Sequence, residues 1–124
     1  SSDLWACAAN GMTGLEQALS IIQMTLVEPG HITWADVARI MSETPAKIGS
    51  LDAEQGRPLA EGEPANIVLV DPKASRVIKP EDQATKGKNN PYRGMEVPGA
   101  VRATFYAGHP TVLNGELASP RRQA

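Results

Sequence analysis

The sequence predicts an α/β chain whose first part is helical and whose second part is built from strands. Three observations support this. Apolar residues recur at helical spacing over Leu15–Leu26, a polar connection rich in Gly and Pro occupies residues 50–64, and a continuous apolar run follows at Ile67–Val70. We therefore expect two units, one over residues 1–50 and one over residues 51–124.

The first helix is expected from about Gly14 to Val27. Thr13 is followed three residues later by Glu16, which is the capping-box pattern. The hydroxyl of Thr13 would accept a hydrogen bond from the Glu16 backbone N–H, and the carboxylate would reach back to Thr13. Apolar residues occupy more than one side of this helix, so we expect it to pack against more protein than this chain supplies.

Two further helices are expected before residue 50. Thr33 and Asp36 repeat the same start signal and predict a helix at about Trp34–Ser42. Thr44 and the following proline predict a separate short helix that ends at Gly49, because proline is well tolerated at a first helical position.

The sequence of residues 51–124 predicts short strands and tight turns. The apolar run predicts a strand at residues 65–70 that is covered on both faces, and the alternation over residues 100–106 predicts a strand with one packed face. The remaining predictions are a short strand at 76–78, a helical turn at 80–82, a loop at 86–94, a turn at Gly108–Pro110, a returning strand at 111–113 and a tight turn at Asn114–Gly115.

Composition excludes several classes of function. The net charge is −2 and both signs are interspersed, so no basic stripe indicates nucleic-acid binding. No apolar run approaches the roughly 18 residues that a membrane-spanning helix needs. A single cysteine cannot form an internal disulfide, which favours a reducing compartment and a cytoplasmic location.

No complete active site is visible in the sequence. Cys7 lacks a second cysteine at CxxC spacing, and His31 and His109 lie in expected turns without a second ligand nearby. A capping role accounts for Glu16 without chemistry. Residues 86–88 (Lys-Gly-Lys) lack the arrangement of a phosphate-binding P-loop, so a solvated or interdomain loop is the better interpretation. We expect no catalytic residue and no metal ligand in this chain.

The segment Ala9–Gly11 stands just ahead of the first expected helix. Backbone N–H groups at a helix start are unpaired and carry partial positive charge, so they can hold a carboxylate or phosphate without a cationic side chain. Every capped helix has this property, so the feature alone is a weak signal.

Several segments together resemble a known family. They are Asn10–Glu16 (Asn-Gly-Met-Thr-Gly-Leu-Glu), Met41–Ile48 (Met-Ser-Glu-Thr-Pro-Ala-Lys-Ile), Gly62–Pro72 (Gly-Glu-Pro-Ala-Asn-Ile-Val-Leu-Val-Asp-Pro), Lys86–Tyr92 (Lys-Gly-Lys-Asn-Asn-Pro-Tyr) and the closing hairpin Gly99–Gly115. Their order resembles the C-terminal portion of the dihydroorotases of the amidohydrolase superfamily. The strand motif alone indicates only an amidohydrolase. The Gly-Leu-Glu and Lys-Asn-x-Pro segments narrow the resemblance to dihydroorotases. Hydantoinases and allantoinases share parts of this C-terminal portion and stay as alternatives.

The resemblance implies the last helices of a (β/α)8 TIM barrel and the C-terminal part of a small composite β-sandwich. It implies that the zinc ligands, and a catalytic aspartate, lie upstream of Ser1. The intact enzyme would interconvert N-carbamoyl-L-aspartate and dihydroorotate in pyrimidine synthesis, whereas this segment alone would be inactive and bind no cofactor. A non-catalytic dihydroorotase-like module that packs on a partner is a further alternative.

The resemblance also implies part of a substrate pocket. In relatives, backbone groups ahead of the Gly-Met-x-Gly-Leu-Glu segment hold the substrate carboxylate, and the matching positions here are Asn10 and Gly11. The family often has Pro-Phe-Gly at residues 9–11, so a backbone contact survives the change and aromatic packing does not. The implied partners are the upstream part of the same barrel, a small-molecule substrate, and a homodimer or a complex with aspartate transcarbamoylase, with neither nucleic acid nor membrane.

Overall fold

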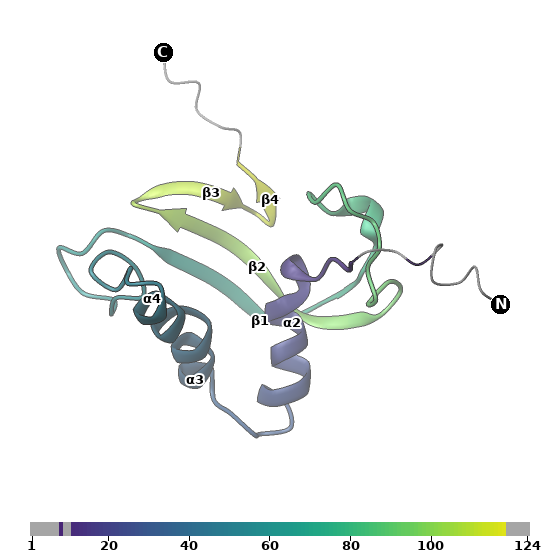
Figure 1. The fold of residues 1–124 in the computed structure, drawn as a ribbon, viewed down its shortest axis with the longest axis horizontal. Helices are drawn as coiled ribbons and strands as arrows, with labels where there is room; N and C mark the ends of the chain where they lie inside the picture. The colour runs from purple at the N-terminus through teal and green to yellow at the C-terminus, as the bar shows by residue number, and fades with distance from the viewer. Residues whose placement is uncertain (1–7, 9–10, 119–124) are drawn as a thin grey trace, which may run out of the picture.

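The computed structural model of the chain describes residue 8 and residues 11–118. Two helical rods precede a four-stranded antiparallel sheet (Figure 1). The first rod consists of η1 (Leu15–Gln17), α2 (Ala18–Ile22) and the π-helical turn η2 (Gln23–Val27), and the second of α3 (Trp34–Ala38), the π-helical turn η3 (Arg39–Glu43) and α4 (Thr44–Ile48). Within the described residues, no helix combines the length and the apolar character needed to cross a membrane.

The first rod confirms the predicted helix but not its predicted capping box. Gly14 is the N-cap, and no side chain caps this end. The backbone N–H of Thr13 donates to the carbonyl of Asn89 at 2.8 Å, so it is not available to Glu16. The Glu16 carboxylate instead accepts from the backbone N–H groups of Ala84 and Thr85. The capping-box prediction for Thr13 and Glu16 is therefore wrong, because long-range donors replace the local ones.

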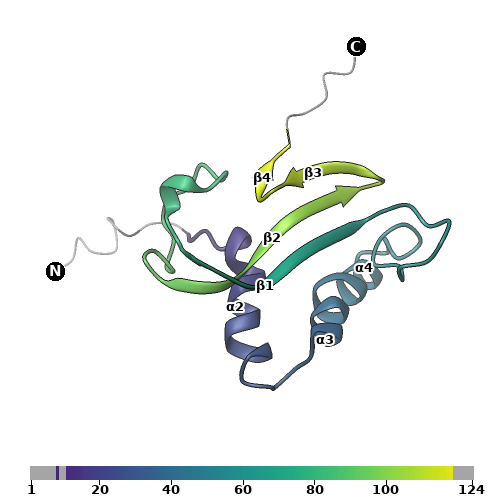
Figure 2. The ribbon, with the colours of Figure 1, turned by 180° about the vertical axis from the view of Figure 1, so that it is seen from behind.

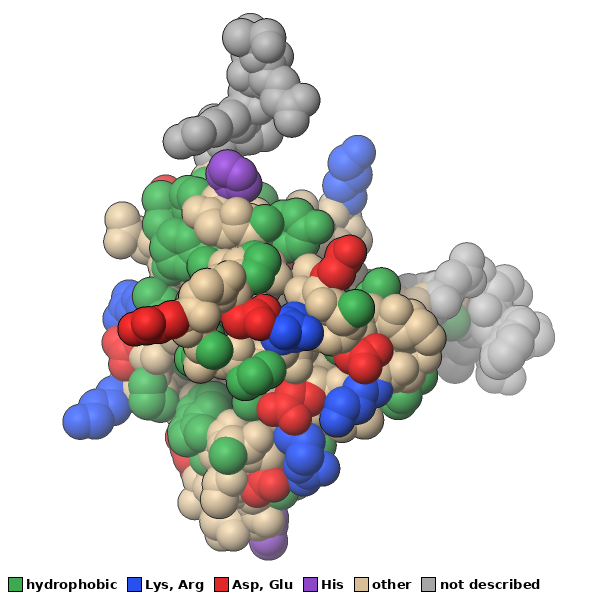
Figure 3. Space-filling view, turned by 90° about the vertical axis from the view of Figure 1, so that its left-hand side faces the viewer, with side chains coloured by type: hydrophobic (Ala, Val, Ile, Leu, Met, Phe, Trp, Pro, Cys, Tyr) green, Lys and Arg blue, Asp and Glu red, His purple; other side chains and the backbone are tan. Residues whose placement is uncertain are grey.

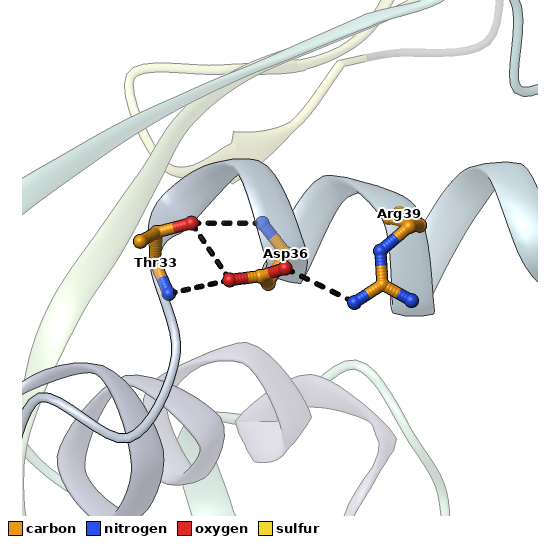
Figure 4. Close-up of polar contacts among 3 residues, drawn as sticks. All are labelled: Thr33, Asp36 and Arg39. Carbon is orange, nitrogen blue, oxygen red and sulfur yellow. Dashed lines mark hydrogen bonds and ion pairs between the residues drawn. The ribbon is translucent and has the colours of Figure 1, made fainter.

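The second rod begins with the capping box that the sequence predicts (Figure 4). The Asp36 backbone N–H donates to Thr33 Oγ1 at 3.2 Å, and the Thr33 backbone N–H donates to Asp36 Oδ2 at 2.9 Å. Arg39 Nη2 donates to the other oxygen, Oδ1, at 3.0 Å. These bonds, with that of the Thr33 backbone as the largest cause, lower the pKa of Asp36 from 3.8 to about 2.

A separate third helix is not formed. Thr44 has helical dihedrals (φ −65°, ψ −46°) inside one continuous rod, and its side chain makes no capping bond. Pro45 has no N–H, so the helix loses one hydrogen bond there, and the wider π turn η3 stands immediately ahead of it. Such turns are where helices absorb an interruption of their bonding. Gly49 ends the rod as predicted, and its N–H donates to the Pro45 carbonyl at 2.9 Å.

The sheet has the order β1-β2-β3-β4, with every neighbouring pair antiparallel. Its strands are β1 (Ile67–Val77), β2 (Glu96–Tyr106), β3 (His109–Leu113) and β4 (Glu116–Leu117). The two strands predicted at 65–70 and 76–78 are one strand, because β2 pairs with both stretches across an irregularity between Asp71 and Ser75. The helical turn at 80–82 is the 3-10 turn η4 (Pro80–Asp82).

Burial of β1 differs from the prediction of a strand covered on both faces. Val68 is 52% exposed and Leu69 is 51% exposed. Successive side chains of a strand point to opposite faces, so the described part of the chain covers neither face here. The buried apolar core lies elsewhere and contains Val37, Ala46, Ile78, Val97 and Ala103.

Two-residue turns connect the last three strands. Ala107 and Gly108 have φ values of 48° and 81°, and Asn114 and Gly115 have φ values of 52° and 80°. Positive φ at both central residues is the type I′ geometry that matches the twist of a hairpin. The predicted hairpins are confirmed, but the first turn lies one residue earlier than predicted, since His109 and Pro110 belong to β3.

The first rod packs against the sheet where α2 crosses it, as both ribbon views show (Figures 1 and 2). Gln23 Nε2 donates to the Pro72 carbonyl at 2.8 Å, and Ser20 Oγ donates to the Gly99 carbonyl at 3.4 Å. Gly99 has φ 80°, and a Cβ at this position would collide with Gln23 Oε1. Glycine is therefore required at this crossing.

Candidate functional site

The candidate site is the segment that leads into the first rod, which runs beside the loop between β1 and β2 (Figure 1). Asn89 of that loop holds the segment on both sides of Met12. Its side-chain amide donates to the Gly11 carbonyl, and its own carbonyl accepts from the Thr13 N–H at 2.8 Å and from Thr13 Oγ1 at 3.3 Å. One loop residue therefore fixes the backbone directly adjacent to the predicted substrate-binding position.

Glu16 joins the same loop to the helix start. Its two carboxylate oxygens accept from the backbone N–H groups of Ala84 at 3.3 Å and Thr85 at 3.1 Å. Bonds to an ionised acceptor are stronger than those between neutral groups. Gly87 completes the contact, because a Cβ there would lie 2.8 Å from Thr13 Cγ2.

One lysine of this loop binds the loop itself. Lys88 Nζ donates to the carbonyls of Gln83 at 3.2 Å and Thr85 at 2.9 Å, so it stabilises its own loop. The loop approaches the helix start closely at Gly87.

Beneath the loop lies a buried amide network. Asn90 Nδ2 donates to Gln17 Oε1 at 3.0 Å and to Gln83 Oε1 at 3.3 Å, while Asn90 Oδ1 accepts from the Tyr92 N–H at 2.8 Å. Gln17 is only 1% exposed. Because a buried polar group is costly to leave without its partner, this network fixes the loop against the first turn of the rod.

A surface cavity of about 280 Å³ opens at the helix start. It is lined by Met12, Thr13, Gly14, Leu15, Glu16, Gln17, Gln83 and Thr85. Two of these side chains are large, apolar and strongly exposed, with Leu15 at 92% and Met12 at 74%. Large apolar side chains beside a cavity indicate a surface that other protein or a ligand covers.

The structure describes only one of the two predicted substrate-binding positions. Gly11 is exposed, and its carbonyl accepts the bond from Asn89. Asn10 lies outside the described residues, as does Cys7. The holding role of Asn89 could not be predicted from spacing, since it is 78 residues from Gly11. The only sequence signal was the Lys-x-Lys-Asn motif of residues 86–89.

The described residues do not provide a zinc site. In residue 8 and residues 11–118, no group of three His, Cys, Asp or Glu side chains lies close enough to hold a metal ion. His31 and His109 are both exposed. The donor set that zinc needs is thus lacking in this part of the chain.

A short ion pair lies away from the candidate site, in the connection between the rods and the sheet. Arg57 donates from Nε and Nη2 to the two carboxylate oxygens of Glu63, each at 2.6 Å. The hydrogen bond from Arg57 lowers the pKa of Glu63. The pair connects the two ends of the bend at residues 57–63. On the face drawn in Figure 3, charged side chains of both signs are scattered among apolar ones.

Comparison with known proteins identifies relatives of this chain. No protein-family model matches it. It is 49% identical over 113 residues to a dihydroorotase of Leifsonia xyli, covering 91% of this chain and 26% of that protein. Over the same shares of both chains, it is 47% identical to a dihydroorotase of Streptomyces coelicolor and 44% identical to one of Mycobacterium tuberculosis.

The chain is homologous to part of dihydroorotase. It spans about a quarter of the length of these curated relatives. The resemblance inferred from the Gly-Leu-Glu and Lys-Asn-x-Pro segments is thereby confirmed at the level of sequence.

Solved structures contain the fold of this chain as one part of a larger protein. An L-hydantoinase from Arthrobacter aurescens matches 95% of the chain with a TM-score of 0.83 at 27% identity, and the match covers 26% of that protein. A D-hydantoinase from a Thermus species matches 94% of the chain with a TM-score of 0.82 at 21% identity and supports the fold alone, covering 25% of that protein. The observed α/β arrangement with its antiparallel sheet is therefore shared with part of these proteins.

Proposed function

We propose that the chain is the C-terminal part of a zinc-dependent dihydroorotase, which interconverts N-carbamoyl-L-aspartate and dihydroorotate. The observation that carries this proposal is the difference in identity between two groups of relatives. Dihydroorotases are 37–49% identical over 82–91% of the chain, while the hydantoinase and dihydropyrimidinase structures lie at 21–30%.

In this proposal, residues 1–50 supply the last barrel helices and residues 51–124 supply strands of a composite β-sandwich. Two features of the structure support packing of this chain against further protein. The side chains of Val68 and Leu69 on β1 are half exposed, and Leu15 and Met12 at the helix start are more exposed still. Apolar surface of this extent favours burial against the upstream protein.

The contribution of this chain to catalysis is substrate binding by backbone groups at Asn10 and Gly11. A helix start that offers N–H groups suits the negative charge of a substrate carboxylate. The metal ligands would come from the upstream protein, where zinc would lower the pKa of a bound water and polarise the amide carbonyl. In this proposal the chain serves that chemistry by orienting the substrate.

A cyclic amidase of the hydantoinase type is the second candidate, because an L-hydantoinase matches this fold with a TM-score of 0.83. The two substrates differ in ring size and in charge, since dihydroorotate is a six-membered ring that carries a carboxylate and hydantoin is a five-membered ring without one. A site built to bind a polar group rejects an analogue lacking it by about 10⁴-fold.

The test is a comparison of kcat/KM for dihydroorotate and for hydantoin, with the full-length protein purified with zinc. We expect dihydroorotate to be preferred by roughly 10³-fold or more. The 124-residue chain alone is expected to turn over neither compound. A preference for hydantoin would establish the second candidate, and activity of the isolated chain would refute the assignment of the metal ligands to the upstream protein.

Assembly and location belong to the same proposal. The upstream barrel is the expected partner within the protein, and a homodimer or a complex with aspartate transcarbamoylase are the expected partners between proteins, in the cytoplasm. Size-exclusion chromatography with light scattering, with and without aspartate transcarbamoylase, distinguishes these states.

A further inference from the structure

We propose that Asn114 is a site of spontaneous deamidation, and that the turn between β3 and β4 controls the rate through the backbone N–H of Gly115. Among the asparagines that the structure describes, only Asn114 is followed by glycine. The inference is independent of the proposed function, because it concerns a turn at the end of the sheet and involves no substrate of the enzyme (Figure 1).

The reaction joins the Gly115 backbone nitrogen to the Asn114 side chain, with water as the only co-reactant. The nitrogen loses its proton to solvent and attacks Asn114 Cγ. A new N–Cγ bond forms, the Cγ–Nδ2 bond breaks, and the leaving nitrogen takes up a proton and departs as ammonia. Water then opens the resulting succinimide ring at either carbonyl and yields aspartate or isoaspartate. Glycine favours the attack because it has no Cβ to hinder the nitrogen.

The two residues of the turn are accessible to solvent. Asn114 and Gly115 are both exposed, so water reaches the ring and ammonia can leave. Asn66 differs in two respects. Its amide is held by two hydrogen bonds, and the next residue, Ile67, has a branched side chain that hinders attack by its nitrogen. Asn66 is therefore an internal control within the same chain.

The folded turn withholds the attacking nitrogen. The Gly115 N–H donates to the Arg102 carbonyl at 3.1 Å. The φ values of 52° at Asn114 and 80° at Gly115 belong to the type I′ geometry. Ring closure requires that the bond to Arg102 break and that the peptide nitrogen turn toward Cγ, out of this geometry. The reaction therefore has to wait until the turn opens.

Opening this turn separates only a small part of the sheet. Strand β4 has two residues, and they form two pairs with β3. Beyond them, the Ala118 N–H donates to the Thr111 carbonyl at 2.9 Å. Local opening of so short a hairpin costs much less free energy than global unfolding. We therefore expect deamidation to proceed in the folded protein, at a rate set by this opening.

Conversion changes the hairpin that contains it. Both products replace a neutral amide by a carboxylate, directly before Glu116 in the chain. Isoaspartate also adds one carbon to the backbone of a two-residue turn. The pair of Leu113 with Glu116 directly flanks the turn, so it cannot keep its register. Formation of isoaspartate thus releases β4 from the sheet.

The experiment incubates the full-length protein at mildly alkaline pH, both folded and in urea. Mass spectrometry follows the peptide that contains residues 114–115, and enzymatic methylation detects isoaspartate. We expect conversion at Asn114 in both conditions, about tenfold slower in the folded protein, from the usual strength of one hydrogen bond. Asn66 should stay unconverted in the folded protein over the same period.

Two substitutions at residue 118 form a matched pair. Ala118→Pro removes the N–H that donates to Thr111, so deamidation of the folded protein should be about threefold faster or more. The hydrogen-exchange rate of the Gly115 N–H should rise by the same factor, because both processes need the same opening. Ala118→Ser keeps the N–H and should change neither rate.

Each outcome decides the inference. Equal rates in the folded and denatured protein, or an unchanged rate in Ala118→Pro, would overturn control by the turn. Conversion in urea with none in the folded protein would overturn the site itself. If Ala118→Pro does not fold, Leu117→Gly is measured instead, since glycine weakens β4 and leaves its N–H groups in place. The comparison of folded and denatured wild-type protein needs no variant.

Discussion

Two segments of this chain share one sequence pattern and differ in structure. Thr33 and Asp36 form a reciprocal capping box at the start of the second rod. Thr13 and Glu16 have the same spacing at the start of the first rod, yet Gly14 is the N-cap there and no side chain caps the end. The pattern therefore describes what four residues can do among themselves, and not what they do when other donors approach.

The difference has identifiable causes. The shorter side chain of Asp36 reaches the backbone of its own N-cap, while the longer side chain of Glu16 extends to the loop at residues 84–85. The N–H of Thr13 is already bound to the Asn89 carbonyl. The first rod thus begins against another part of the chain, and the second begins on its own.

Among variants that test this difference, we expect Gly87→Ala to change the free energy of unfolding most. A Cβ at residue 87 would lie 2.8 Å from Thr13 Cγ2, so the Thr13 side chain or the loop must shift. We expect a loss of about 1–3 kcal/mol in the free energy of unfolding, measured by urea denaturation. Thr13→Ser removes the opposing methyl group, so the double variant should recover most of the loss. Equal losses in the single and double variants would contradict the steric explanation.

A second test removes the carboxylate of each segment in turn. Glu16→Ala leaves the N–H groups of Ala84 and Thr85 without their acceptor, so their hydrogen-exchange rates should rise about tenfold. Asp36→Ala should leave those two rates unchanged, because its partners are local. Exchange measured by NMR or mass spectrometry checks this, and similar effects of both variants on residues 84–85 would show that the two segments are not distinct.

A third test removes the two threonine hydroxyl groups. Thr33→Ala should lower the free energy of unfolding by about 1 kcal/mol, the usual value for loss of a helix cap. Thr13→Ala should lower it by less, since Thr13 Oγ1 makes only a 3.3 Å bond to the Asn89 carbonyl. Chemical denaturation of both variants measures the difference. A larger loss for Thr13→Ala would mean that the first segment depends on its threonine after all.

Much of the fold could be predicted because it depends on local patterns. Both helical rods, the apolar strand after residue 64 and the two hairpins follow from spacing and turn residues. The break expected before Pro45 was wrong because a π turn keeps the rod continuous. The two strands expected in β1 are one, because β2 pairs with both sides of an irregularity. In both cases a neighbouring element overrides a local sequence signal: the π turn η3 ahead of Pro45 in the first case, and the strand β2 beside β1 in the second.

The candidate site was predictable only in part. The segment at Asn10 and Gly11 is predicted from its position ahead of a helix and from its family motif, and it stays a prediction. Its support could not be predicted, since Asn89 lies 78 residues from Gly11 and Thr85 lies 69 residues from Glu16. No spacing rule connects residues so far apart along the chain, and an asparagine in a polar loop has no distinguishing periodicity.

The smallest effect concerns the titration of Asp36. The bond from the Thr33 backbone is the largest cause of its lowered pKa, and the bond from Arg39 comes second. Arg39→Ala should therefore raise the pKa from about 2 while leaving it below 3.8, as measured by NMR titration. A lowered pKa in the folded state stabilises the fold above pH 3.8, and this stabilisation is lost as the pH falls from 3.8 to about 2. The variant should lose it at a higher pH than the wild type, and an unchanged titration would contradict the role of Arg39.

The position of β1 at the end of the strand order has a consequence for producing this chain in isolation. In the described part of the chain, β1 has β2 as a neighbour on one side only. Its second half carries Pro72 and Lys73, which discourage a further strand from joining, but Ile67–Val70 has neither proline nor charge. Edge-to-edge aggregation is therefore expected to start at that half, and a lysine placed at the half-exposed Val68 would be the first remedy for a soluble preparation.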